Sequence, residues 1–198
     1  MQSSAWLFQS WYYLGVGRLD SALWSMRHGW RIDPAALIIG TRLGTLLYLG
    51  DSLKASERQL ESVLKVDRNL MAAKVDLAIA YADDRQCDRA LAVVSSISTP
   101  LHQNNYKPYI WVRCKSPSEA RMMVDSVEAA AASGHFVNGF FFAAAYAALN
   151  DRASTYRWLN RALEDKSCCM FQLRTLPAFR SFRSDPEFLA IVRRAASP

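Results

Sequence analysis

The chain has 198 residues, of which 51% are hydrophobic, and a formal net charge of +6 at pH 7. This apolar content excludes a wholly disordered polypeptide, and the small numbers of glycine (8) and proline (7) favour helix over strand. The excess positive charge lies in residues 101–198, which hold 13 basic and 8 acidic side chains. Because the arginines there are scattered, we interpret them as a solvated surface, with contact to an acidic partner as the alternative.

The four cysteines predict no disulfide framework. Cys87, Cys114, Cys168 and Cys169 include no Cys-x-x-Cys pair, and vicinal cysteines do not easily bridge to each other. A reducing compartment fits this pattern best. The N-terminus lacks the features of a signal peptide, and the longest apolar stretch, residues 35–50, is too short to span a bilayer. We therefore expect a cytoplasmic protein with no membrane span.

Turn residues divide the first part of the chain into units that each hold two helices. In residues 3–36, Gly15 and Gly17 separate a first helix from a second. Residues 37–70 follow the same plan, with the break at Gly50. Each unit therefore predicts a helix, a short turn and a second helix.

The next two units are less alike. Residues 71–104 form a third unit whose turn, residues 83–85, contains no glycine. In residues 105–135, a short first helix is predicted to begin around Pro108, and a second begins at Pro117. We interpret this region as a diverged unit with a shortened first helix.

The last part of the chain returns to the pattern and then ends in a cap. Residues 136–167 form a fifth unit with a turn at residues 150–151. Residues 168–198 are predicted to form the cap, with a turn at Pro177 and a last helix from about Asp185 to Arg194.

Equivalent residues of the first three units recur at a spacing of 34. One position of the first helix is occupied by Tyr13, Leu47 and Tyr81. One position of the second helix is occupied by Ala22, Ser56 and Ala90. A period of about 34 residues is typical of the tetratricopeptide repeat, and the chain resembles that family over most of its length. The resemblance implies an all-α, right-handed solenoid of about five helix pairs with a short C-terminal capping helix, as a single array over residues 1–198.

The tail carries a second resemblance. The run Arg183-Ser184-Asp185-Pro186, followed after one residue by Phe188, is similar to the end of tetratricopeptide arrays attached to bacterial winged-helix, adenylate-cyclase or protein-kinase domains. This resemblance implies the regulatory, partner-binding part of a larger signalling or transcription protein, and we expect the chain to be a fragment of one. The alternative is a free-standing scaffold or chaperone for secretion or surface-appendage assembly.

No pattern in the sequence predicts catalysis, a metal site or a cofactor. His28, His102 and His135 lack the spacing of metal ligands. The chain has no glycine-rich phosphate-binding loop. No recognition helix or stacking platform for nucleic acid is apparent. We therefore expect a non-enzymatic protein that binds a protein or peptide partner.

One pair of adjacent cysteines and one pair of adjacent aspartates are interpreted as structural rather than functional. Cys168 and Cys169 lie beside apolar residues and are interpreted as small packing side chains. Asp83 and Asp84 lie at a helix end and are interpreted as turn or surface residues.

The resemblance places the partner-binding groove on the concave face, which the first helices of successive units line. By the repeat register, its exposed positions are Leu7, Phe8, Trp11, Ile38, Thr41, Arg42, Thr45, Tyr48, Val75, Asp76 and Ile79. Trp11, Arg42 and Tyr48 are of the residue types that dominate binding energy at interfaces. The alternative for these three is packing against a neighbouring helix or a preceding repeat. The aromatic first helix also suggests self-association as a further alternative.

Overall fold

The computed structural model describes residues 2–97, 100–167 and 169–196, and within them the protein is built from helices without strands. The α-helices and the two short 3-10 helices follow one another in this order: α1 Gln2–Gly15, α2 Leu19–Ile32, α3 Leu37–Leu49, α4 Leu53–Val66, α5 Met71–Asp83, α6 Cys87–Ser95, α7 Pro100–Cys114, α8 Pro117–Ala132, α9 Gly139–Ala148, α10 Arg152–Glu164, η1 Met170–Gln172, η2 Pro177–Phe182 and α11 Pro186–Ala196.

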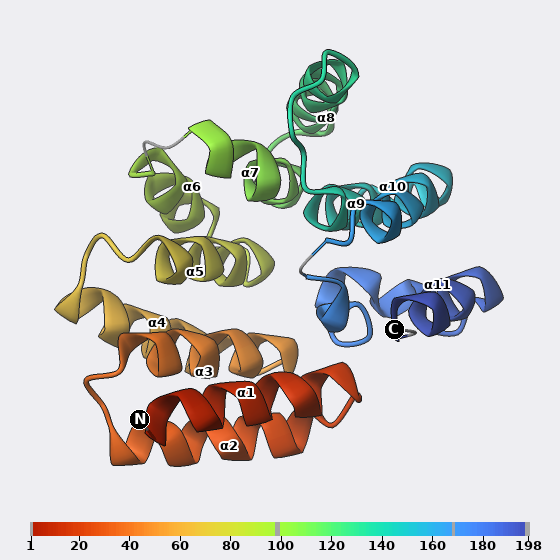
Figure 1. The fold of residues 1–198 in the computed structure, drawn as a ribbon. Helices are drawn as coiled ribbons and strands as arrows, with labels where there is room; N and C mark the ends of the chain where they lie inside the picture. Colours follow the sequence, from red (N-terminus) through yellow and green to blue (C-terminus); the bar gives the residue numbers. More distant parts are fainter. Residues whose placement is uncertain (1, 98–99, 168, 197–198) are drawn as a thin grey trace.

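The helices stack in sequence order into a curved, solenoid-like array (Figure 1). The odd-numbered helices from α1 to α9 contact one another in order and follow the inner side of the curve. The even-numbered helices from α2 to α10 lie outside them. The all-α, solenoid-like fold predicted from the sequence is confirmed.

The turns inside four of the helix pairs share one backbone conformation. Gly17, Asp51 and Arg85, spaced 34 residues apart, all have a φ angle between 59° and 77°, in the left-handed region. Asn150 adopts the same conformation in the turn between α9 and α10. In each turn the next residue donates its backbone N–H to a carbonyl of the preceding helix, which closes the helix end. This spacing in the backbone equals the period seen in the sequence.

Small residues lie where the two helices of a pair approach closely. Ala22, Ser56 and Ala90 are all fully buried, each on the second helix of a pair. The Ser56 hydroxyl donates to the backbone carbonyl of Gly44 at 2.8 Å. A Cβ atom at Gly44 would lie 2.5 Å from Cγ of Leu60, so only glycine fits there without displacement.

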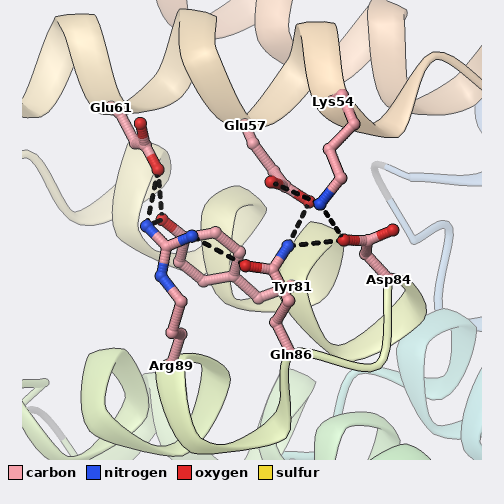
Figure 2. Close-up of polar contacts among 7 residues, drawn as sticks. All are labelled: Lys54, Glu57, Glu61, Tyr81, Asp84, Gln86 and Arg89. Atoms are coloured by element: carbon pink, nitrogen blue, oxygen red, sulfur yellow. Dashed lines mark hydrogen bonds and ion pairs between the residues drawn. The ribbon is translucent and has the colours of Figure 1, made fainter.

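A polar network joins the second and third helix pairs on the outer side of the array (Figure 2). The Tyr81 hydroxyl of α5 donates to Glu61 of α4 at 2.5 Å, and Arg89 of α6 forms an ion pair with the same carboxylate at 2.7 Å. The hydrogen bond from Tyr81 lowers the pKa of Glu61. A glutamate, a tyrosine and an arginine from three successive helices thus fix how neighbouring pairs are stacked.

The same combination recurs farther along the chain. Tyr146 of α9 donates to Glu128 of α8 at 2.5 Å, and Arg157 of α10 also pairs with Glu128. The indole N–H of Trp158 donates to this carboxylate as well, at 3.0 Å. These two networks occupy corresponding places, between one pair and the next, and we interpret both as structural.

The end of the chain turns back toward its beginning. The C-terminal cap, formed by η1, η2 and α11, lies between α9 and α1 (Figure 1). η1 packs against α1, η2 packs against α9, and Arg180 of η2 forms an ion pair with Asp51 in the turn between α3 and α4. The predicted last helix is confirmed, with Phe188 and Ile191 buried. The return of the cap to α1 was not predicted.

The least regular region differs from its prediction. The helix expected to begin around Pro108 instead begins at Pro100 and continues to Cys114, so it also crosses the predicted boundary at residue 104. Pro108 lies inside this helix, where it removes one backbone hydrogen bond without ending the helix. The prediction of a shortened first helix was therefore wrong.

The prediction that the cysteines form no disulfide was also wrong. Cys87, at the start of α6, is bonded to Cys114, at the end of α7, with their Cα atoms 5.1 Å apart. Their separation of 27 positions in the sequence hid a pairing that depends on how α6 and α7 meet. The argument for a reducing compartment, which assumed free thiols, therefore loses its basis. No helix in the described part of the chain is long and apolar enough to cross a membrane.

Candidate functional site

The structure separates the predicted groove residues by exposure. Four of them are buried rather than exposed, which contradicts the prediction: Thr41, Thr45, Tyr48 and Ile79. Four are partly buried: Leu7, Arg42, Val75 and Asp76. Three are exposed: Phe8, Trp11 and Ile38.

The buried members are covered because α5 packs directly against α3. The Thr45 hydroxyl lies 2.5 Å from a carboxylate oxygen of Asp76, and the Tyr48 hydroxyl donates to Asp83 at 2.7 Å. These bonds cross from one inner helix to the next, so Thr45 and Tyr48 hold the array together. A register that places a side chain on the inner face does not reveal whether the next helix covers it.

Trp11, Arg42 and Asp76 form a row across α1, α3 and α5. The Arg42 guanidinium lies 5.8 Å from the centre of the Trp11 ring, within the range of a cation–π contact. Burial raises the pKa of Asp76, while the Thr45 hydrogen bond and the charge of Arg42 oppose that rise. The structure thus brings together four of the predicted residues, which are Trp11, Arg42, Thr45 and Asp76. Their contacts are internal to the protein, and the row ends at the exposed Trp11.

The strongest polar cluster of the inner face, which we call the Asp83 hub, consists of Tyr48, Asp83, Tyr109 and Arg113. Both tyrosine hydroxyls donate to the Asp83 carboxylate, Tyr48 at 2.7 Å and Tyr109 at 2.8 Å. The Arg113 Nε atom lies 2.7 Å from the same carboxylate. Burial, together with the charge of Asp83, raises the pKa of Tyr48 and of Tyr109. The two tyrosine donors and the positive charge of Arg113 compensate a carboxylate whose side chain is only 8% exposed.

The interpretation of Asp83 as a turn or surface residue was therefore wrong. Asp83 is the last residue of α5, where an acidic residue is usually solvated, and the sequence does not show that α7 places Tyr109 and Arg113 over it. Tyr109 and Arg113 were missed for the same reason. Their spacing of four residues puts them on one side of α7, which is the single signal the sequence offered.

A cavity of about 810 Å³, which we call the hub cavity, lies between the Asp83 hub and η2. Its wall comes from the α3–α4 turn, α5, α7, the α9–α10 turn and η2, and its polar side chains are Asp51, Asp83, Tyr109, Arg113, Asn150, Arg180 and Ser181. The ends of four helix pairs and the cap therefore converge on one polar space.

A second cavity, of about 550 Å³, lies between α1 and the C-terminal cap, and we call it the α1 cavity. It is lined by Trp11, Tyr12, Gly15, Val16, Met170, Phe171, Leu173, Arg174, Val192 and Ala195. The wall is mostly apolar, and the charge within it belongs to Arg174.

Exposed apolar side chains concentrate on the first helix pair, whose helix α1 lines this second cavity. Six of the eleven large hydrophobic residues that are exposed in the described structure lie in residues 8–32, in the first helix pair and its turn. On α1, Phe8 is 63% exposed, Trp11 39% and Tyr12 66%, and the Phe8 ring meets the Trp11 ring edge-on at 5.5 Å. Such a concentration on one terminal helix pair indicates an interaction surface.

The residues considered for metal or redox chemistry do not form a centre. The described residues contain no cluster of three or more histidine, cysteine or acidic side chains that could hold a metal ion. His28 packs against Trp6 and Trp24, and Cys169 is partly buried against the core. Cys168 and the His102 side chain lie outside the described residues.

Comparison with known proteins adds no identification, because no family model and no curated protein matches the chain.

Proposed function

We propose that the chain is a protein-binding module without enzymatic activity, and that apolar side chains of the partner insert between α1 and the C-terminal cap. The observation that carries this proposal is the exposed aromatic row on α1 beside an apolar cavity. Phe8, Trp11, Tyr12 and Val16 follow a helical spacing of three and four residues, so they form one continuous face.

The site differs from the groove expected from the sequence. The middle of the inner face is used by contacts of α3 with α5, such as Tyr48 with Asp83, and the cap lies across its opening. The end of the inner face at α1 keeps large side chains exposed. Tryptophan and tyrosine in a partly enclosed pocket are favourable anchors for a partner, because they bury much apolar area and also offer a polar group.

The wider role that we propose rests on the resemblance of the tail. The module would be the regulatory, partner-binding part of a bacterial signalling or transcription protein. A free-standing scaffold or chaperone is the second candidate. The two differ in what precedes the module in its natural protein, since the first requires an effector domain in the same polypeptide or in a stable complex.

The test is affinity capture with matched variants. Wild-type protein is compared with Trp11→Ala/Tyr12→Ala and with the control Met122→Ala/Phe136→Ala, which removes two exposed apolar side chains elsewhere. We expect a partner that is retained by the wild type and the control and lost by the α1 variant, with identical helical circular dichroism for all three. The same proteins retained by all three would place the binding surface elsewhere and contradict the proposal.

A further inference from the structure

The hub cavity has the size and polarity of a small-molecule site. Its volume of about 810 Å³ lies within the usual range of about 300–1,000 Å³ for such sites. Its chemistry is distinct from that of the α1 cavity, because its wall carries two arginines, Arg113 and Arg180, and several neutral polar groups. A ligand in the hub cavity would bind independently of the proposed protein partner, which binds at α1.

Arg113 is paired with Asp83 through one side of its guanidinium and is not saturated. The Asp83 carboxylate lies against its Nε atom, whereas a guanidinium carries five N–H groups. Among the described residues no hydrogen bond engages its two terminal nitrogens, and its side chain is 27% exposed within the cavity wall. Arg113 therefore presents a fixed pair of donors, which is the arrangement that binds a carboxylate or phosphate in two places.

The backbone around Arg113 is also fixed. Its carbonyl accepts a hydrogen bond from Arg85 at 3.1 Å, and the neighbouring residue Cys114 is linked to Cys87. The end of α7 is thus tied to the α5–α6 turn and to the start of α6. A donor that is already positioned loses little conformational entropy when a ligand binds.

The acidic groups of the cavity do not cancel these donors. Asp83 already receives hydrogen bonds from Tyr48 and Tyr109 in addition to the contact with Arg113. Asp51 pairs with Arg180, but both side chains of that pair are about 60% exposed, and exposed ion pairs exchange readily with water and other ions. Arg180 can therefore turn toward a ligand.

We infer that the hub cavity binds a small organic anion, whose carboxylate or phosphate groups are held by Arg113 and Arg180. Arg113 supplies the fixed contact, and Arg180 supplies a second that replaces its pair with Asp51. Asn150 of the α9–α10 turn and Ser181 of η2, which also line the cavity, supply neutral donors for further oxygen atoms of the ligand.

The test measures binding of citrate and of inorganic phosphate to the full chain by isothermal titration calorimetry at constant ionic strength. We expect saturable binding of at least one probe, with a dissociation constant in the millimolar range or below. Arg180→Gln should weaken it at least about tenfold, which corresponds to about 1.4 kcal/mol. Arg113→Lys, which keeps a charge beside Asp83 but loses the fork, should weaken it similarly.

Arg121→Gln is the matched control, since it removes an exposed arginine on α8 away from the cavity. The control should bind like the wild type. The inference is overturned if neither probe binds saturably. It is also overturned if Arg180→Gln and Arg121→Gln both bind the probe as tightly as the wild type does. Circular dichroism of each variant checks that the fold is retained, and Arg180→Gln keeps the test valid if Arg113→Lys does not fold.

Discussion

Arg180 of η2 and Asp51 of the α3–α4 turn form an ion pair across 129 residues of chain. The pair lies where the C-terminal cap returns to the first half of the array. Both side chains are largely exposed, so the pair accompanies this closure without being its main cause. The cause is apolar: Phe179 and Phe182 of η2 are fully buried, and the Phe179 ring meets Phe140 of α9 at 5.7 Å.

The first prediction separates these two contributions. Arg180→Ala should change the free energy of unfolding by no more than about 1 kcal/mol, because the pair is exposed. Phe182→Ala should lower it by about 3–5 kcal/mol, because it leaves a cavity in the packed cap. Urea unfolding followed by circular dichroism measures both. Equal losses for the two variants would show that the ion pair, and not the packing, holds the cap in place.

The second prediction concerns two acidic residues of α5 with opposite surroundings. Asp83→Asn should lower the free energy of unfolding by about 3 kcal/mol or more, because it removes the buried carboxylate that faces the Arg113 guanidinium and accepts from both tyrosines. Asp76→Asn should leave stability at neutral pH unchanged or raise it, because burial disfavours the charged carboxylate there. Chemical unfolding at pH 7 compares the two. A large loss for Asp76→Asn would contradict this distinction.

The raised pKa of Asp76 also predicts how its contribution to stability depends on pH. A carboxyl whose pKa is higher in the folded than in the unfolded chain holds its proton more tightly when folded. Its contribution is therefore greatest below the ordinary aspartate pKa and is lost as pH rises through the interval up to the folded value. Asp76→Asn should remove this part of the pH dependence, which unfolding curves from acid to neutral pH would show against the wild type.

The third prediction concerns the disulfide. Replacing both cysteines, as Cys87→Ser/Cys114→Ser, should lower the free energy of unfolding by about 3 kcal/mol, since the bond closes a loop between residues 27 positions apart in the unfolded chain. A reducing agent should lower the melting temperature of the wild type to about that of the double variant. It should leave the melting temperature of the double variant unchanged. Cys169→Ser, in the partly buried segment before η1, serves as the control. Alkylation of Cys87 and Cys114 without prior reduction would contradict the bond.

The fourth prediction tests the close approach of α3 and α4. Gly44→Ala should destabilise the protein by about 1–3 kcal/mol, because the added methyl group would lie 2.5 Å from Leu60. Gly15→Ala is the matched control, since nothing lies within 4 Å of its Cβ position. Thermal unfolding of both variants gives the comparison. A neutral Gly44→Ala would mean that α3 and α4 have room to separate.

Local features of the fold could be predicted because they depend on residues near each other in sequence. The spacing of 34 placed Ala22, Ser56 and Ala90 at equivalent second-helix positions, and all three are buried there. Helix ends were also predicted well where glycine or an acidic turn residue interrupts the apolar pattern. The exception was α7, because Pro100 and Pro108 carry the same local signal, and packing of the helix against α5 and α9 decides which of them begins it.

The sequence by itself determined the helices, their pairing and the exposed aromatic side chains of α1, because helical periodicity and chain breaks are local properties. Only the tertiary structure decided the site. It buried Tyr48 under α5, brought Asp83 to Arg113, joined Cys87 to Cys114 and returned the cap to α1. Each of these contacts joins residues more than 25 positions apart. Whether such residues meet depends on how successive helix pairs are rotated relative to one another, and these rotations add up to the curvature of the array.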